Sequence, residues 1–352
     1  MSDTPPMTAP PTLASLGWSD HFASQCDPDD SPLRLSEVRR NRVVGIGPGG
    51  TRELALPGDI LTTQLAVGDW VLADLDVGRV TRVLERRAAL ARKSVSHRGQ
   101  SQLIAANVDT LVIVTSCNAD FNVARLERYV ALALEADAQP VIVITKADKA
   151  EARAPDDYRA EAEAISPRIV ALVLNAKDPA QVQALERWCG PGQTVAMVGS
   201  SGVGKSTLGV ALTGQKLATA DIREDDAKGR HTTTARALLP MKAGGWLIDM
   251  PGMRELGLHD VADGIDTLFE ELTDLARDCK FRNCEHQGEP GCAIRAAIEA
   301  GDISPDRFER WQKLKSEDAH NTETISEQRA RGKAFARQVK MAKRAKGKGR
   351  KG

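Results

Sequence analysis

The order of apolar and polar positions indicates where the main folded domain of this chain lies. Residues 101–258 contain short apolar runs that alternate with helix-like stretches, as a parallel sheet covered by helices requires. The clearest runs are Val141–Ile144, Thr194–Val198 and Trp246–Ile248, each short enough to be a buried strand. We therefore predict an α/β domain over residues 99–258.

Ahead of this domain, residues 36–98 show short β-type runs separated by turn signals. The runs are Arg42–Ile46, Gly68–Leu72 and Gly78–Leu84, and Pro48-Gly49-Gly50 is typical of a turn. Small five-stranded barrels of the OB type have this pattern, although other small β-barrels share it. We predict an OB-fold barrel here.

The remaining parts differ in composition. Residues 1–35 are rich in Pro, Ser and Asp, which predicts a disordered acidic extension. Residues 259–325 have a helical pattern around a cluster of cysteines, and residues 326–352 form a basic tail. No internal repeat is visible. The chain is therefore expected to have three folded domains with a segment at each end.

A glycine-rich sequence follows the run Thr194–Val198. Gly199–Ser206 matches the phosphate-loop pattern G-x-x-x-x-G-K-[ST], and Ser206–Leu212 continues as a predicted helix. Glycines let consecutive backbone N–H groups surround phosphate oxygens at a helix N-terminus, whose dipole favours anions. We expect Lys205 to contact the β- and γ-phosphates and the Ser206 hydroxyl to bind Mg²⁺. The predicted GTP-binding residues of this segment are Gly199, Ser200, Ser201, Gly202, Val203, Gly204, Lys205, Ser206 and Thr207.

Two other sequences are of the kind that completes such a site. Thr145-Lys146-Ala147-Asp148 is a near match to the guanine-reading N/T-K-x-D element, in which the Asp148 carboxylate accepts two hydrogen bonds from guanine. Adenine lacks these donors, so Asp148 predicts a preference for GTP over ATP. Asp249-Met250-Pro251-Gly252 ends an apolar run as D-x-x-G. We expect Asp249 to hold Mg²⁺ through water and the Gly252 N–H to sense the γ-phosphate.

The order of these motifs along the chain is unusual. Asn175 and Ala176 resemble the S-A-K element, whose backbone N–H contacts the guanine base, and they also precede the phosphate loop. In an ordinary GTPase the base-reading elements follow the phosphate loop. Here the order is base reader, phosphate loop and then switches, which predicts a circularly permuted P-loop GTPase domain.

Three of the six cysteines fall close together with a histidine, in the spacing C-x₄-C-x-H-x₅-C. Three thiolates and one imidazole give a closed tetrahedral Zn²⁺ site, which is structural because no position is left for water. A chance cluster of reduced thiols is the alternative. The predicted ligands of one zinc ion per chain are Cys279, Cys284, His286 and Cys292. Cys26, Cys117 and Cys189 are expected to be packing or surface residues.

The formal net charge of +0 conceals basic segments. Residues 34–98 carry 12 Lys or Arg against 7 Asp or Glu, and residues 329–352 carry 11 Lys or Arg and no acid. Such segments favour RNA phosphates, with a merely solvated surface as the alternative for the barrel and a membrane surface as the alternative for the tail. No apolar run approaches the length of a membrane-spanning helix, so we expect a cytoplasmic protein without a membrane partner. The basic residues at the end of the barrel are Arg82, Arg86, Arg87, Arg92, Lys93 and Arg98.

In its motifs and their order, the chain resembles the ribosome small-subunit-dependent GTPase family (RsgA) over roughly residues 36–320. Gly229–Thr234 looks like the switch I signature of that family, and Ala105–Asp109 resembles the entry to its GTPase domain. The resemblance implies an OB-fold barrel, a permuted GTPase domain and a helical zinc-binding domain in this order. Two residues depart from the family pattern. Thr145 replaces the usual Asn, which predicts a weaker tether to the base and phosphate loop, and Met250 replaces the usual Thr.

The catalytic residue is less explicit in the sequence. Many GTPases have a Gln after D-x-x-G that orients the attacking water, but Met253 follows it here. His231 in switch I is the candidate, because a neutral imidazole can accept a hydrogen bond from water. Packing or RNA contact is the alternative role of His231. Thr233 of the same segment is expected to join Ser206 and Asp249 around Mg²⁺.

These expectations combine into one functional hypothesis. The chain is predicted to be a monomeric GTPase that binds the small (30S) ribosomal subunit and its rRNA, and that hydrolyses GTP late in subunit assembly. Two alternatives remain open at this point. The protein could be an RNA-binding assembly factor that uses GTP and GDP only as a conformational switch, or a GTPase that acts on tRNA or another RNA.

Overall fold

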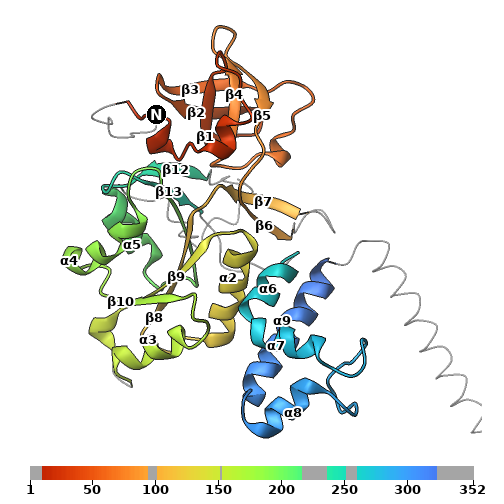
Figure 1. Ribbon diagram of the computed structural model, residues 1–352. Coiled ribbons are helices and arrows are strands. Elements are labelled where there is room, and N and C mark those ends of the chain that lie inside the picture. Colours follow the sequence, from red (N-terminus) through yellow and green to blue (C-terminus); the bar gives the residue numbers. More distant parts are fainter. Residues whose placement is uncertain (1–9, 94–100, 151–152, 216–235, 251–259, 323–352) are drawn as a thin grey trace, which may run out of the picture.

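The computed structural model describes residues 10–93, 101–150, 153–215, 236–250 and 260–322. Three bodies follow one another along the chain, namely a β-barrel, an α/β domain and a group of C-terminal helices (Figure 1). The predicted domain order is therefore present in the described residues. The basic tail at 326–352 and switch I lie outside them.

The α/β domain is built on a parallel sheet. Its strand order is β10-β9-β8-β11-β13-β12, and only β12 runs antiparallel to its neighbour. This arrangement confirms the sheet that the alternating pattern predicts. The strands are β8 (Thr110–Ser116), β9 (Gln139–Thr145), β10 (Val170–Val173), β11 (Thr194–Val198), β12 (Ala237–Pro240) and β13 (Trp246–Asp249).

The strand runs are continuously apolar because helices cover both faces of this sheet. Alternate residues of β8 and β9 belong to two different cores. Leu111, Ile113 and Ile142 pack with residues of α2 (Val123–Glu135) and α3 (Pro155–Glu163) on one face. Val112, Val114, Val141 and Val143 pack on the other face with α5 (Lys205–Thr213), α4 (Pro179–Val182) and the 3-10 helix η4 (Gln183–Trp188). A two-residue period thus divides each strand between the two cores.

The N-terminal β-barrel is closed. Its strands pair in the cycle β1-β2-β3-β5-β4-β1, with β3 and β5 parallel and the other pairs antiparallel. The strands are β1 (Pro32–Val38), β2 (Arg42–Gly47), β3 (Gly50–Ala55), β4 (Trp70–Asp74) and β5 (Arg79–Val83), with the 3-10 helix η2 (Thr62–Gln64) between β3 and β4. A two-stranded sheet of β6 (Ala89–Lys93) and β7 (Ser101–Ala106) then leads into β8.

The barrel and the α/β domain share one hydrogen-bonded sheet. Strand β1 pairs with β12 at Glu37 and Ala237, so the nucleotide-domain sheet continues into the barrel as an 11-stranded sheet. The two domains are therefore joined by backbone pairing as well as by side chains.

The prediction of disorder for residues 1–35 is wrong for residues 10–35. This segment contains the 3-10 helix η1 (Ala14–Leu16), the short helix α1 (Asp20–Ala23) and the start of β1. Leu16 and Phe22 are buried, and the Trp18 ring stacks edge-on against Trp70 with centroids 4.7 Å apart. The Pro- and Asp-rich composition conceals these few apolar side chains, which are enough to hold the segment against the barrel.

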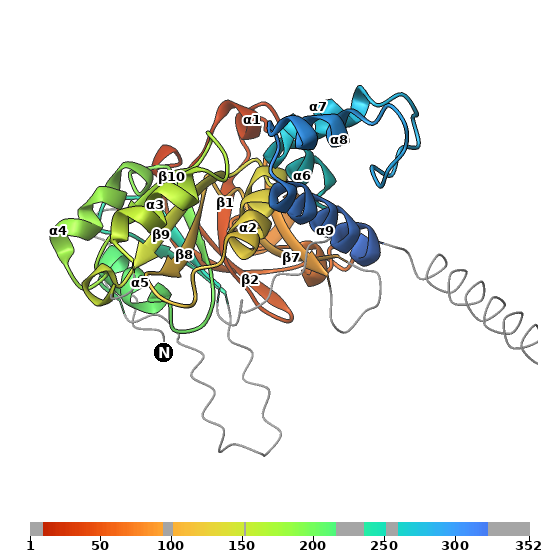
Figure 2. The same cartoon turned by 90° about the horizontal axis from the view of Figure 1, so that it is seen from below.

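Four helices form the C-terminal body beside α2 (Figures 1 and 2). They are α6 (Ala262–Leu268), α7 (Glu270–Arg277), α8 (Ala293–Ala300) and α9 (Pro305–Thr322). Helix α6 crosses α2 so closely that a Cβ at Gly264 would overlap the Ala131 carbonyl oxygen. In the described part of the chain, no helix is both long and apolar enough to cross a membrane.

Candidate nucleotide site and metal centre

The predicted nucleotide-binding residues gather at one edge of the parallel sheet. Thr145 lies beside Ser116 at the ends of β9 and β8, and β11 ends at Val198 between β8 and β13. Because the carboxyl ends of parallel strands share an edge, the segments after β9, β10, β11 and β13 all meet there. Ligands bind at this edge of open α/β sheets, and the motifs scattered along the sequence are brought to it together.

The phosphate loop has the backbone that its glycines permit. Gly199, Gly202 and Gly204 all have positive φ, at 140°, 78° and 102°. A Cβ at Gly199 would overlap the Val114 carbonyl oxygen of β8, so only glycine fits there. Gly204 caps α5, and the loop thus leads directly to a helix N-terminus, where backbone N–H groups favour an anion.

Lys205 and Ser206, at the start of α5, lie beside the phosphate loop. The Lys205 ammonium donates to the carbonyl oxygens of Gly199 and Ser200 at 2.7 and 2.5 Å, which places its charge across the loop. Ser206 and Thr207 follow it on the first turn of α5 and are exposed. The Ser206 hydroxyl is therefore accessible to a metal ion, while Val203 beneath the loop is buried.

Thr145 keeps a tether between the base-reading strand and the phosphate loop. Its hydroxyl is buried and lies 2.5 Å from the Val203 carbonyl oxygen and 3.0 Å from that of Thr115. One hydroxyl proton serves these two acceptors in turn. The tether to the loop that the Thr-for-Asn difference put in question is thus present, through a hydroxyl in place of an amide.

The base-reading residues form the outer side of the site. Lys146 has a left-handed backbone (φ 58°) that turns the chain into the 3-10 helix η3 (Ala147–Lys149), and Asp148 is exposed on it. After β10, the Asn175 carboxamide oxygen accepts from the Lys177 N–H at 3.0 Å, which orders the turn that contains Ala176. A carboxylate accessible to solvent at this edge is what a guanine-reading residue requires.

Cys117 is a neighbour of the site that the sequence did not point to. It follows β8, and its N–H donates to the Thr145 carbonyl oxygen at 2.9 Å. Burial raises the pKa of the Cys117 thiol, and the nearby Asp148 carboxylate raises it further. The thiol is therefore neutral near pH 7, and it underlies the base-reading segment as a packing group.

The magnesium-site residues are described only in part. Asp249 is the last residue of β13, next to β11, and is half-buried at the same edge as Ser206. Met250 is buried, which suits its apolar side chain. Gly252, Thr233 and the catalytic candidate His231 lie outside the described residues.

The four predicted metal ligands come together in the C-terminal body. Their ligand atoms all lie within 4.8 Å of one another. The Sγ atoms of Cys279 and Cys292 are 3.9 Å apart, and each is 3.5 Å from His286 Nδ1. A tetrahedral ion with metal–sulfur bonds of about 2.3 Å would separate two sulfur atoms by about 3.8 Å. The cluster therefore has the dimensions of a tetrahedral metal site.

The ionisation of the cluster also suits a metal. Burial lowers the pKa of His286, so its imidazole is neutral and has a lone pair to donate near pH 7. Burial alone would raise the pKa of Cys279, but the N–H groups of Ala293 and Ile294 at the start of α8 outweigh it and the pKa is lowered. The helix start thus favours the thiolate form that binds metals.

Glu289 is a positioning residue of the metal loop that sequence reasoning missed. Its carboxylate accepts backbone N–H groups of Glu285 and Gln287 at 2.8 Å and of Gly288 at 3.1 Å. These bonds, with that to Glu285 the strongest, lower the pKa of Glu289 to about 2. The ionised carboxylate therefore holds the turn around His286, whose own φ is 61°. The only hint of this role in the sequence is that Glu289 lies between the ligands His286 and Cys292.

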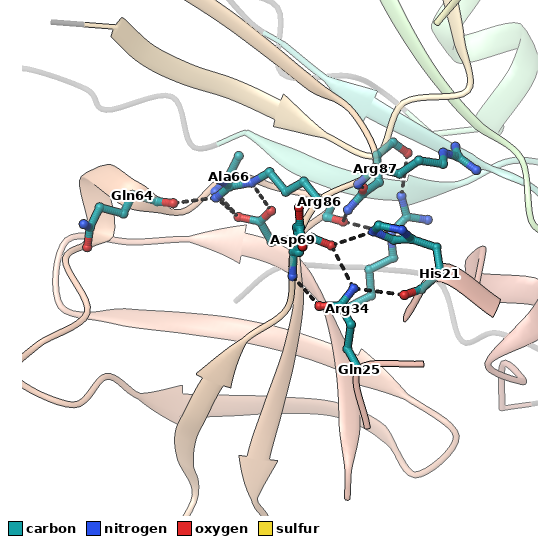
Figure 3. A network of polar contacts seen from close by, with 11 residues as sticks. His21, Gln25, Arg34, Gln64, Ala66, Asp69, Arg86 and Arg87 are labelled. Atoms are coloured by element: carbon teal, nitrogen blue, oxygen red, sulfur yellow. Dashed lines mark hydrogen bonds and ion pairs between the residues drawn. The ribbon is translucent and has the colours of Figure 1, made fainter. Parts of the chain in front are cut away.

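Three of the arginines that were predicted to contribute to an RNA footprint have acidic partners within the protein. Arg86 binds the buried Asp69 carboxylate at 2.5 and 2.8 Å (Figure 3). Arg87 forms an ion pair with Asp109. Arg82 lies 3.7 Å from Asp30. These side chains join the barrel to its neighbours. Side-chain contacts of Arg92, Lys93 and Arg98 are outside the described part of the chain.

A buried arginine completes this junction between the barrel and the nucleotide domain. Arg34 is 1% exposed and donates to the carbonyl oxygens of Leu16, Gly68 and Asn107 at 2.6–3.4 Å (Figure 3). Burial lowers its pKa to about 10, so it remains charged at neutral pH. Asp109 then extends the junction to the phosphate-loop strand by accepting the Thr194 N–H at 2.7 Å.

A parallel sheet with a phosphate loop, a D-x-x-G segment and a base reader earlier in the chain defines a circularly permuted P-loop GTPase. Two solved structures share this fold. YjeQ from Thermotoga maritima has a TM-score of 0.61 and 26% identity, over 81% of this chain and 97% of the other. YloQ, described as a circularly permuted GTPase, has a TM-score of 0.56 and 22% identity, over 88% of this chain and 100% of the other.

Relatives in sequence identify the family. The sequence model of the RsgA GTPase family matches residues 83–259. A Mesorhizobium japonicum protein named small ribosomal subunit biogenesis GTPase RsgA is 52% identical over 319 residues, which are 89% of this chain and 91% of the relative. A Vibrio parahaemolyticus protein named small ribosomal subunit biogenesis GTPase RsgA 2 is 43% identical over 330 residues, 92% of this chain and 91% of the relative. The chain belongs to the RsgA GTPase family.

Proposed function

We propose that this protein binds the small ribosomal subunit and hydrolyses GTP during late subunit assembly, with the subunit accelerating turnover. The observation that carries the proposal is the meeting of base reader, phosphate loop and Asp249 at one sheet edge, in a chain that also contains a barrel and a metal-binding body. The names of its relatives, at 43–52% identity over about nine-tenths of the chain, support the ribosomal partner.

In this proposal the nucleotide site works as follows. Asp148 reads guanine, the N–H of Ala176 contacts the base, and the loop Gly199–Thr207 surrounds the phosphates. Ser206, Thr233 and Asp249 would hold Mg²⁺, which would supply charge neutralisation for the phosphates. His231 orients the attacking water, and the Gly252 N–H senses the γ-phosphate.

The metal centre is proposed to hold structural Zn²⁺. Three thiolates and one imidazole are the ligands that zinc favours, and the 3.9 and 3.5 Å separations fit its tetrahedral geometry. Metal analysis of protein purified without chelator is expected to give about one zinc per chain. Replacing Cys284 or His286 should release it while the nucleotide domain still binds GTP, because that domain has its own core. Protein with no bound metal would contradict the assignment.

The barrel and the basic tail are proposed as RNA-binding parts of a cytoplasmic monomer. The strand cycle β1-β2-β3-β5-β4 supports an OB fold, a type of barrel that commonly binds nucleic acid. Residues 326–352 add a run of positive charge suited to rRNA phosphates. We propose domain bounds of 36–98, 99–258 and 259–325, with residues 10–35 packed against the barrel.

Turnover with purified ribosomal subunits tests this function. We expect GTP hydrolysis to be slow for the protein alone, faster with small subunits and unchanged with large subunits. Co-sedimentation with the small subunit in the presence of a non-hydrolysable GTP analogue should accompany it. Binding without stimulated turnover would instead indicate an assembly factor that uses the nucleotide only as a switch. Stimulation by tRNA, and not by the subunit, would indicate another RNA substrate.

A further inference from the structure

An exposed aromatic side chain stands on the metal-binding loop. The four residues between the first two ligands are Lys280, Phe281, Arg282 and Asn283, and all four are exposed. Phe281 is 43% exposed, and it is the only aromatic among the large apolar side chains exposed in the described part of the chain. This segment protrudes from the C-terminal helices on the side away from the parallel sheet (Figures 1 and 2). The segment that carries the exposed Phe281 therefore lies on the outer side of the C-terminal helices.

The backbone around Phe281 is held in place. Cys279 and Cys284, which belong to the metal cluster, lie at the two ends of the segment. The Lys280 N–H donates to the Gly291 carbonyl oxygen at 3.0 Å, and the Cys284 N–H donates to that of Phe281 at 3.2 Å. The ring is therefore carried by a fixed turn and costs little ordering entropy when it binds a ligand.

The charges next to the ring are positive. The Lys280 ammonium lies 5.6 Å from the centre of the Phe281 ring, and Arg282 follows on the other side in sequence. The negative charge of Glu289 in the same loop is taken up by three backbone N–H groups. An exposed ring with one cation beside it and a second, exposed cation next in sequence matches a nucleotide, whose base stacks on the ring and whose phosphates meet the cations.

We propose that Phe281 stacks against an unpaired base of RNA, with Lys280 and Arg282 contacting the adjacent phosphates. The inference rests on the proposed function, because the RNA partner is taken to be the rRNA of the small subunit. The metal loop would thus contact RNA directly in addition to its structural role.

Variants of Phe281 in the full-length protein test the stacking. Phe281→Leu keeps an apolar side chain but loses the aromatic face, and Phe281→Tyr keeps the face. Affinity for small subunits with the GTP analogue is expected to fall about tenfold for the Leu variant and to change less than about twofold for Tyr. Metal content and GTP affinity serve as controls, because Phe281 is neither a ligand of the metal nor near the sheet edge. If wild type and the Leu variant bind small subunits with equal affinity, the stacking inference is overturned, while the proposed function is unaffected. A wild-type protein that does not bind subunits would remove the proposed function and this inference with it.

Salt dependence separates an RNA partner from a protein partner. Lys280→Ala and Arg282→Ala should each reduce the slope of log affinity against log salt by about 1, because each removes a phosphate contact. Phe281→Leu should lower the affinity at every salt concentration and leave the slope unchanged. Unaltered slopes in both cation variants would show that the ring meets a protein surface, which would overturn the proposal.

Discussion

At the scale of single residues, the choice of nucleotide depends on Asp148. Its carboxylate is exposed at the sheet edge, where it can accept two hydrogen bonds from guanine. Asp148→Asn should therefore weaken GTP binding and favour xanthosine triphosphate, which presents an acceptor where guanine has an amino group. Competition binding with the three nucleotides measures this. Asp157→Asn, an exposed change on α3, is the matched control. A wild-type protein for which GTP and ATP compete equally would contradict the role of Asp148.

Lys205 is expected to contribute to nucleotide binding, and His231 is expected to contribute to the hydrolysis step. Lys205 places its charge across the phosphate loop, so Lys205→Ala should weaken nucleotide binding by removing a charge-assisted contact. His231→Ala should leave GTP affinity nearly unchanged and lower subunit-stimulated turnover by roughly 100-fold, as expected for a group that positions water. Nucleotide affinity and turnover are measured on the same preparations. Unchanged turnover would exclude His231 from the mechanism and support a packing or RNA-contact role.

At the scale of elements, a buried ionic cluster joins α2 to α9. Glu127 of α2 has no exposed side-chain surface, and its two carboxylate oxygens accept from Arg307 at 2.9 Å and Arg310 at 2.8 Å. Arg307 also donates to Glu271 and to the Leu268 carbonyl oxygen, both at 2.9 Å. The C-terminal helices are thereby fixed to the nucleotide domain.

Removing the shared carboxylate should release this contact. Glu127→Ala removes the fully buried carboxylate that the half-buried Arg307 and Arg310 share, a change that costs about 3 kcal/mol, because Arg307 keeps its bonds to Glu271 and Leu268. We expect hydrogen exchange of the α9 amides to accelerate markedly. Glu317→Ala is the control, because it breaks the more exposed pair with Arg128 between the same helices and should cost at most about 1 kcal/mol. Similar protection of α9 in both variants would argue against a dominant role for Glu127.

The elements also show where sequence reasoning succeeded and where it could not. Strands β11 and β13 begin at the predicted residues Thr194 and Trp246, because an apolar run buried on both faces has little alternative to a central strand. The metal cluster was found because ligand chemistry fixes both residue type and spacing. Most of the candidate nucleotide site could be predicted from such local sequence signals.

Partners that are distant in sequence leave no such signal. Arg86 and Arg87 were assigned to RNA because a charge count does not reveal that Asp69 and Asp109 neutralise them. Glu127 reads as an ordinary helix residue until α9, about 180 positions later, supplies its arginines. The order of residues 10–35 likewise depends on a surface that the barrel provides.

At the scale of the whole molecule, the segment after D-x-x-G leads within about ten residues to the C-terminal body. Helix α6 begins at Ala262, ten positions after Gly252 in the sequence. A γ-phosphate-dependent shift at Gly252 would therefore act on the helices that carry the metal loop. We expect tight subunit binding with the GTP analogue and weaker binding with GDP, as a population shift set by different contacts.

A flexible insertion tests this coupling. A Gly/Ser insert after Leu258 should abolish most of the difference between the two subunit affinities. Nucleotide affinity and metal content should stay normal, because the contacts of α2 with α6 and α9 still hold the C-terminal body in place. If the difference between GTP analogue and GDP survives in the insert variant, the coupling runs through switch I or the barrel.

The pairing of β1 with β12 has a consequence for how the chain is made. Glu37 and Ala237 are 200 positions apart in the sequence. The Ser15 carbonyl oxygen accepts a hydrogen bond of 2.7 Å from the indole N–H of Trp246, which is synthesised much later. Synthesis proceeds at about 5–20 residues per second, so on the order of ten seconds or more separates completion of the barrel strands from emergence of their partners. During each round of translation the closed barrel therefore forms first, while the end of β1 around Glu37 still lacks its β12 partner. A chain that terminated before Ala237 would keep this end of β1 unpaired permanently, and with it a short template for pairing with other chains.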